Sequence, residues 1–336
     1  MNFTFGTDPE FMVVDQNDNF RSAITFVKGD RKNRIKIGEF GFYYDNVLAE
    51  CAVKPAGSNA EAIINIRTAL QHYKEILDPH GVKIIPQAAA EYNDAELDTG
   101  KLLKSPLGGM VQEGRYAGCK AEKCAYILNT LKPTELQEKI RHENLRTAGG
   151  HVHLGTELGK FHLPCVSLIR TMDLFVGLPL LILDQDKSGL LRRKLYGAAG
   201  RYRQPPWGAE YRTLSNYWLS SPRLVDLVYD LCAFCVEFVE AERHKEFWHI
   251  DEEKLDSDDF WNSGGDPADL HICFGYDSDK LRGLFEGKGN TDEGGASEYI
   301  DIIKDHLPSE LFDKIQSLAW PSGMKPKTDF YEEWAL

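Results

Sequence analysis

The chain lacks both an excess of positive charge and a long hydrophobic run. Its 336 residues include 39 lysines and arginines against 52 aspartates and glutamates, a formal net charge of -13. A nucleic acid or an anionic membrane would meet no general basic face on such a chain, so we expect neither as a partner. The most apolar run, residues 174–183, is shorter than the roughly 20 residues that a membrane-spanning helix needs.

Two nucleotide-binding signatures are also missing. Neither G-x-x-x-x-G-K-S/T nor G-x-G-x-x-G occurs, so a bound nucleotide would not be held by a P-loop or a Rossmann turn. The seven cysteines provide a single C-x-x-C, Cys232 and Cys235, inside an apolar helical pattern that predicts buried thiols rather than zinc ligands. The first residues show no charged segment followed by an apolar one, and with the odd cysteine count this favours a reducing cytoplasm.

The composition is that of an ordinary globular protein, with 42% hydrophobic and 27% charged residues. The length suffices for a large domain with a sizeable core. All the informative motifs fall in residues 1–248, which we assign to one domain. The pattern weakens afterwards, and residues 249–336 are predicted to form a mainly helical extension packed on that domain, with short amphipathic helices at 296–306 and 309–318.

A hairpin pattern surrounds residues 205–208, where two prolines and a glycine predict a turn. Residues two apart on an extended arm share a face. Arg201 and Arg203 therefore point one way on the first arm, and Glu210 and Arg212 point one way on the second. Arginine forks match phosphate oxygens, and a carboxylate matches a hard cation such as Mg²⁺. The pattern indicates a site for a nucleotide polyphosphate with its metals, although an ion-paired hairpin would show it too.

Two earlier strand patterns carry acidic side chains. In residues 1–14, Phe3, Phe5, Phe11 and Val13 take one parity, and Asp8 and Glu10 take the other. Pro9 between them favours an edge strand or a bulge. Glu50 lies in an apolar stretch, where an unpaired carboxylate is costly and a cation would satisfy it. These acids are candidate metal ligands, and the alternative is a solvated polar face.

The segment Ala148–Gly155 reads Ala-Gly-Gly-His-Val-His-Leu-Gly and predicts a further strand. His151 and His153 share one face of it, and the glycines before them would let a ligand or another backbone approach closely. Histidine ligates metals and donates to phosphate. A lone H-x-H also suits zinc, and many such pairs are only structural.

Three longer helices are predicted among these strands. One follows a capping box that begins at Ser58. Another, over residues 164–184, is apolar nearly all round and therefore buried, with a kink near Pro179. A third begins at Ser221, which is followed by proline, and carries an apolar stripe that we assign to the core.

The motifs follow the order acid-x-acid, Glu, H-x-H, Arg, Glu-x-Arg, which resembles the glutamine synthetase and glutamate-cysteine ligase superfamily. Within it, four stretches are similar to the carboxylate-amine ligases of phiEco32-like phages, known as COOH.NH2 ligase type 2. The stretches are Gly6-Thr-Asp-Pro-Glu-Phe11, Gly149-Gly-His-Val-His-Leu-Gly155, Arg192-Arg-Lys-Leu-Tyr-Gly197 and Ala209-Glu-Tyr-Arg-Thr-Leu-Ser-Asn-Tyr-Trp218. The resemblance covers roughly residues 1–245.

The resemblance implies an α+β fold whose curved antiparallel sheet holds ATP and Mg²⁺ or Mn²⁺ ions on its concave face, with helices on its convex face. It implies that ATP phosphorylates a carboxylate and that an amine then displaces phosphate, in the cytoplasm of a host cell if a phage encodes the chain. The metal ligands it implies are Asp8, Glu10, Glu50, His151 and Glu210, with Asp8 standing where glutamate is usual. The phosphate-binding residues it implies are His153, Arg201, Arg203 and Arg212, and Arg212, Arg203 and Glu50 would act in catalysis.

Three alternatives stay open. A phosphotransferase of the same superfamily, acting on a guanidino group, would use the same ATP face. A metal-dependent hydrolase built on His151 and His153 would need zinc and no nucleotide. A non-enzymatic interaction protein would need no aligned carboxylates. The motifs do not identify the carboxylate, the amine or the oligomeric state, and glycine-bearing loops near 105–118 and 262–295 are the candidates to close over a site.

Overall fold

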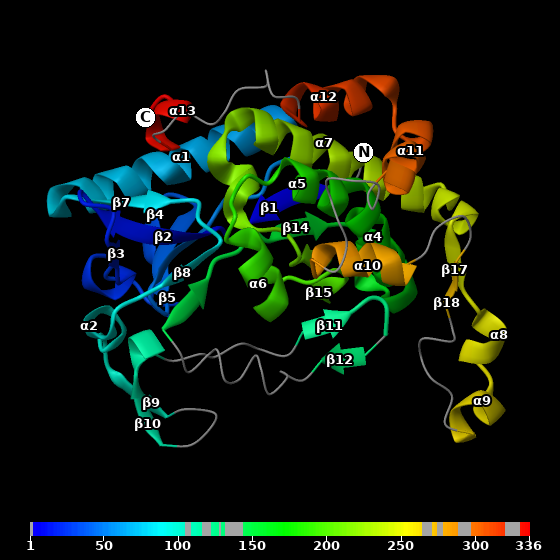
Figure 1. Cartoon of the computed structure of the whole chain (residues 1–336), viewed down its shortest axis with the longest axis horizontal. Helices are drawn as coiled ribbons and strands as arrows, with labels where there is room; N and C mark the ends of the chain where they lie inside the picture. The colour runs from blue at the N-terminus through cyan, green and yellow to red at the C-terminus, as the bar shows by residue number, and fades with distance from the viewer. Residues whose placement is uncertain are drawn as a thin grey trace.

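The computed structural model describes residues 3–104, 109–115, 122–127, 129–131, 144–263, 271–273, 278–287, 297–319 and 330–336. Within them, helices and antiparallel strands form a mixed α+β fold, as the sequence predicts (Figure 1). The strands are β1 (Thr4–Thr7), β2 (Glu10–Asp15), β3 (Phe20–Arg21), β4 (Ile35–Ile37), β5 (Phe40–Asp45), β6 (Leu48–Ala52), β7 (Val82–Ile85), β8 (Ala89–Glu91), β9 (Leu102–Lys104), β10 (Met110–Gln112), β11 (Glu122–Cys124), β12 (Asn129–Leu131), β13 (Leu145–Thr147), β14 (Val152–Gly155), β15 (Arg201–Arg203), β16 (Ala209–Tyr211), β17 (Trp248–Ile250) and β18 (His271–Cys273). The α-helices are α1 (Asn59–Leu77), α2 (Asp94–Leu97), α4 (His162–Met172), α5 (Leu178–Leu183), α6 (Gly189–Leu195), α7 (Pro222–Glu240), α8 (Glu252–Leu255), α9 (Asp258–Asn262), α10 (Ser278–Phe285), α11 (Ser297–His306), α12 (Ser309–Ala319) and α13 (Phe330–Glu333).

The described residues form two six-stranded sheets, and the N-terminal strands β1 and β2 belong to different ones. One has the strand order β1-β14-β16-β15-β11-β12, and the other has the order β3-β2-β6-β5-β4 with β7 also paired to β2. Only Asp8 and Pro9 separate β1 from β2, so the chain passes directly from one sheet into the other. Proline has no N–H for a strand ladder, and the Pro9 carbonyl accepts a hydrogen bond from the Cys51 N–H. The predicted edge or bulge is thus a break between two sheets, and β2 itself lies inside its sheet.

Helices α1 and α7 lie side by side and cover one face of the sheets (Figure 1). Phe11 on β2 packs against Tyr73 of α1, with ring centroids 6.4 Å apart. Phe5 on β1 packs against Tyr229 of α7 at 5.4 Å. Because neighbouring strand residues point to opposite faces, Glu10 points away from these helices. The acidic side chains therefore occupy the face that α1 and α7 leave uncovered.

The predicted starts of α1 and α7 are confirmed. Ser58 and Ser221 each accept a hydrogen bond from the backbone N–H three residues further on, which satisfies one of the unpaired N–H groups at a helix start. The apolar stripe of α7 is buried, and Cys232 and Cys235 lie within it with no exposed surface. Burial raises the pKa of the Cys232 thiol. Both cysteines are core residues, as predicted.

Residues 162–183 form a continuous helical run in which a π-helical turn, Asp173–Gly177, joins α4 to α5. By length and composition this run could cross a membrane, but 89% of its most apolar window is buried inside the protein. It is therefore a core helix. The predicted kink is the π-helical turn, which ends two residues before Pro179 of α5, a residue that cannot donate a helical hydrogen bond.

Asp173→Asn is expected to weaken the pH dependence of stability. Asp173 is 0% exposed and accepts a hydrogen bond from the Tyr211 hydroxyl at 2.6 Å. Burial raises the pKa of its carboxyl to about 7, against about 3.9 in an unfolded chain. Between these values the folded protein keeps a proton that the unfolded chain has lost, so stability falls as pH rises through this window.

The variant stays neutral at this position, so its free energy of unfolding should gain on that of the wild type as pH rises from 5 to 8. Urea unfolding at several pH values measures the difference. Asp305→Asn, at an exposed position on α11, is the matched control and should show no such trend. A difference between Asp173→Asn and wild type that does not change with pH would contradict the assignment.

The described part of the C-terminal region packs on the same core. Phe285 of α10, Tyr299 of α11 and Trp334 are buried in the apolar cluster that also holds Phe5 of β1. Trp334 donates its indole N–H to the Leu219 carbonyl at 2.9 Å. Helices α11 and α12 match the two predicted amphipathic helices. The division of the chain at residue 248 stays a prediction.

The two loops predicted to close over a site are only partly within the described residues. Of the first, 109–115 are described, and they include β10. Of the second, 262–263, 271–273 and 278–287 are described. The remaining parts of both loops lie outside the described residues.

Candidate functional site

The predicted hairpin is confirmed, since β15 and β16 pair antiparallel with Arg203 opposite Glu210. The turn between them ends at Gly208, whose φ is +157°, a value that glycine adopts more readily than other residues. A Cβ at Gly208 would overlap the carbonyl oxygen of Leu154 on β14. The hairpin therefore lies tightly against β14, and the register places Glu210 opposite His153.

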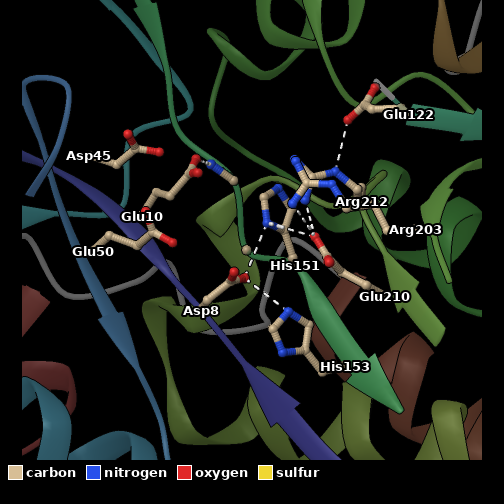
Figure 2. A network of polar contacts seen from close by, with 12 residues as sticks. Asp8, Glu10, Asp45, Glu50, Glu122, His151, His153, Arg203, Glu210 and Arg212 are labelled. Carbon is tan, nitrogen blue, oxygen red and sulfur yellow. Dashed lines mark hydrogen bonds and ion pairs between the residues drawn. The ribbon is translucent and has the colours of Figure 1, made fainter. Parts of the chain in front are cut away.

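A first group of ligating side chains forms across β14 and β16 at the break after β1. The Nδ1 atom of His151 lies 3.2 Å from an Asp8 carboxylate oxygen and 3.9 Å from a Glu210 carboxylate oxygen. One ligand atom from each of the three residues lies within 4.8 Å of the others. Figure 2 shows their side chains pointing toward one another. Three of the predicted metal ligands thus meet at one point.

A second group forms on β2, β5 and β6. Glu10 lies directly opposite Glu50 in the ladder, and Asp45 completes a set whose ligand atoms also lie within 4.8 Å of one another. The Tyr43 hydroxyl donates to Glu50 at 2.5 Å. Arg31 lies 2.7 Å from Asp45 and 3.5 Å from Glu50. The predicted acids therefore divide into two neighbouring groups, and Figure 2 shows Glu10, Asp45 and Glu50 together to one side of Asp8 and His151.

Asp45 is a candidate ligand that the sequence analysis missed. A tight turn joins β5 to β6, so that Asp45 lies opposite Leu48 and Tyr43 lies opposite Glu50. Residues opposite each other in an antiparallel pair share a face, as do residues two apart on one strand. A hairpin register drawn from residues 40–52 would therefore have placed Asp45 beside Glu50.

Two carboxyls of the second group, Glu10 and Glu50, have raised pKa values. Burial, together with the charges of Asp45 and Asp8, raises the pKa of Glu10 to about 7. Burial also raises the pKa of Glu50 well above its usual range, and this side chain is only 1% exposed. Two buried carboxylates that face each other disfavour ionisation of both. A divalent cation between them would reverse this effect.

The first group differs because it contains imidazoles. Burial alone would raise the pKa of Asp8, but His153 and His151 hold it well below its usual range. Burial, with the charge of Arg212, lowers the pKa of His151 to about 3. His151 is therefore neutral at pH 7, which is the form that ligates metals.

Both groups fit hard divalent cations. One supplies two carboxylates and an imidazole, and the other supplies three carboxylates. Oxygen ligands of this kind suit Mg²⁺ and Mn²⁺, and thiolates, the usual ligands of structural zinc, belong to neither group. The buried carboxylates with raised pKa values provide the independent sign that positive charge belongs here.

Arg212 is held rigidly beside the first group. It is 4% exposed, forms an ion pair with Glu210, and donates from Nε to Glu122 at 2.8 Å. Its guanidinium carbon lies 5.0 Å from the centre of the Tyr196 ring. Glu122 and Tyr196 were missed by the sequence analysis because the first lies in a stretch with no clear pattern and the second carries no charge. They fix the direction in which the Arg212 fork points.

The other two predicted arginines are placed differently. Arg203 lies 3.3 Å from Glu210, and its Nε is buried without a hydrogen-bond partner among the described residues. An anion would satisfy this donor. Arg201 accepts a hydrogen bond from the Arg212 N–H through its carbonyl, and its side chain makes no ion pair within the described chain.

The strand that carries the histidines packs closely against its neighbours. His153 places Nε2 3.2 Å from an Asp8 oxygen, so Asp8 lies between both histidines. Gly149 and Gly150 were expected to admit a ligand or another backbone, and the backbone part of this prediction is confirmed. Gly149 forms a β-bridge with Ser215, and the Gly150 N–H donates to the Leu214 carbonyl. A Cβ at Gly150 would lie 2.8 Å from the Ser215 carbonyl oxygen and would overlap the Trp218 indole nitrogen.

Part of the chain matches a known protein family. Residues 142–255, about a third of the chain, match the family described as phage phiEco32-like COOH.NH2 ligase-type 2. The matched segment includes β14 and the β15–β16 hairpin, and hence His151, Glu210 and Arg212. Asp8, Glu10 and Glu50 lie outside it. No curated protein matches the chain.

Proposed function

We propose that the protein is an ATP-dependent carboxylate-amine ligase, on the premise that residues 142–255 match a family of COOH.NH2 ligases. The observation that carries the proposal is the pair of ligand groups on either side of the break between β1 and β2, with two arginines beside one of them. Phosphoryl transfer depends on positioning and charge neutralisation more than on covalent help from the protein. This arrangement supplies both.

The proposal extends to the fold. The H-x-H and Glu-x-Arg motifs lie along β14 and β16, which pair antiparallel, and the acid-x-acid motif lies where the chain passes from β1 into β2. Helices α1 and α7 cover the opposite face. This arrangement supports our proposal that the chain belongs to the glutamine synthetase and glutamate-cysteine ligase superfamily. We also propose the roles that the resemblance implies for the other site residues, including phosphate binding by Arg201 and His153.

In the proposed reaction, a substrate carboxylate oxygen attacks the γ-phosphorus of ATP and ADP leaves. The amine then attacks the carbonyl carbon of the acyl phosphate, and phosphate leaves as the amide forms and the amine loses a proton. Bound Mg²⁺ or Mn²⁺ would neutralise phosphate charge in both groups. Arg203 and Arg212 would stabilise the charge that develops on the transferring phosphoryl group, and Arg203 has a buried donor free for it among the described residues.

Phosphate release from the purified protein tests the proposal. Incubated with ATP, Mg²⁺ and pools of carboxylates and amines, the protein should release phosphate only when all four are present. EDTA should abolish release, and Mn²⁺ should restore it. Failure of every carboxylate and amine pool, with ATP left unbound in calorimetry, would contradict the assignment. Release of ADP with a stable phosphorylated guanidino product, and no need for an amine, would favour the phosphotransferase instead.

A further inference from the structure

The hairpin turn beside the site presents an exposed tryptophan. Trp207 is 44% exposed, whereas Trp218, Trp248 and Trp334 are each nearly completely buried. These four are the tryptophans whose side chains the structure describes. Exposing so large an apolar ring gives up the stabilisation that its burial would provide. An exposed tryptophan therefore calls for a specific reason.

The backbone holds this ring outward. The Gly208 N–H donates to the Pro205 carbonyl and closes the turn. Gln204 donates from its amide to the Gly159 carbonyl at 3.1 Å and ties the hairpin to the segment before α4. Gly159 also lies so close to Gly208 that a Cβ there would overlap the Gly208 backbone. Trp207 is thus carried by a turn that these contacts hold in place.

The ring lies next to the first ligand group. The centroids of Trp207 and His153 are 5.3 Å apart, with an angle of 46° between the ring planes. His153 in turn lies 3.2 Å from Asp8. The chain of contacts therefore runs from the exposed ring, through one imidazole, to a carboxylate where phosphates and their metals are proposed to bind. A ligand with an anionic end and a flat aromatic end would match both ends of this chain.

We propose that Trp207 is the stacking surface for the base of the nucleotide, an inference that rests on the proposed ATP-dependent function. In this arrangement the phosphates lie at the first ligand group, and the base lies on the exposed indole face at the hairpin turn. Stacking recognises the flat face that every base has, so this contact favours nucleotides over inorganic polyphosphate and discriminates weakly among bases. Trp207 is a binding residue, and it takes no part in the transfer of the phosphoryl group.

Calorimetric titration of the full chain with ATP and with inorganic tripolyphosphate, both with Mg²⁺, tests the inference. Loss of one base–aromatic stack typically weakens binding about tenfold or more. Trp207→Ala should lose this much affinity for ATP and keep its affinity for tripolyphosphate. Trp207→Phe should retain most of the ATP affinity. Ile64→Ala, at a 62% exposed apolar position on α1, is the control and should bind both ligands like the wild type.

Each other outcome is decisive. Equal loss of affinity for ATP and tripolyphosphate, or no loss for either, would overturn the base contact while leaving the proposed function intact. A wild-type protein that binds neither ligand would overturn the proposed function, and the base contact with it. Sedimentation of wild type and Trp207→Ala tests whether the ring mediates self-association. If only the wild type self-associates, the exposed ring belongs to an interface between copies, and the inference fails.

Discussion

Arg212→Ala is expected to lower turnover by on the order of 100-fold or more, because it removes a preorganised donor from the site of charge development. Arg212→Lys should rescue this poorly, since a point charge cannot reproduce the planar fork that Glu210 and Glu122 hold in place. Steady-state phosphate release, normalised to the folded fraction from thermal melts, measures the effect.

The structure also predicts a stability loss for this variant. Arg212 is 4% exposed and is paired with two partly buried carboxylates, and breaking such a pair from one side typically costs about 3–5 kcal/mol. Glu122→Gln breaks one of these pairs but leaves the guanidinium in place, so it should lose far less turnover than Arg212→Ala. Lys54→Ala, whose lysine pairs with Glu39 away from the site, is the neutral control. If Arg212→Ala melts early but keeps near-normal turnover per folded molecule, Arg212 has only a structural role.

Glu50→Gln is expected to give opposite effects on stability and on function. Burial raises the pKa of the Glu50 carboxyl in the folded protein, so its charge destabilises the metal-free fold at neutral and higher pH. The neutral amide removes this cost, and its oxygen can still accept the Tyr43 hydroxyl. The metal-free variant should therefore unfold at a higher temperature than wild type at pH 8. The gap should shrink as pH falls, because the wild-type carboxyl then takes up its proton.

With metal present, the order should reverse. Mn²⁺ should stabilise the wild type by mass action, whereas the variant lacks one of the proposed ligands. Its Mn²⁺ affinity and turnover should fall by at least the roughly 10- to 100-fold that loss of an outer partner of a metal ligand typically costs. Calorimetric Mn²⁺ titration and melts with and without EDTA measure both parts. Glu39→Gln, at an exposed carboxylate, is the control. Unchanged Mn²⁺ affinity in Glu50→Gln would remove Glu50 from the metal site.

The sequence predicted local features because they depend on local geometry. Alternation along a strand follows from the backbone, so the faces of Glu10, Glu210 and Arg212 could be read from parity. The turn at residues 205–208 and the helix start at Ser221 follow from backbone chemistry that proline, glycine and serine carry wherever they occur. None of these depends on which distant segment lies alongside.

The site itself depends on which strands are neighbours. Parity cannot show that Glu10 pairs with Glu50 while Asp8 meets His151, so two ligand groups rather than one are a result of the tertiary structure. The same holds for Asp45, whose position depends on the register of one hairpin.

Long-range strand pairing also determined which residues surround Arg212. Glu122 comes from a segment with no readable pattern and meets Arg212 only because β11 pairs with β15. The sequence predicted that a ligand or another backbone would approach Gly150, and only the tertiary structure shows that the Ser215 backbone and the Trp218 indole do so. By itself, the sequence determined the residue types and the face of each strand on which they lie. Long-range strand pairing, which no local period encodes, determined which of them meet.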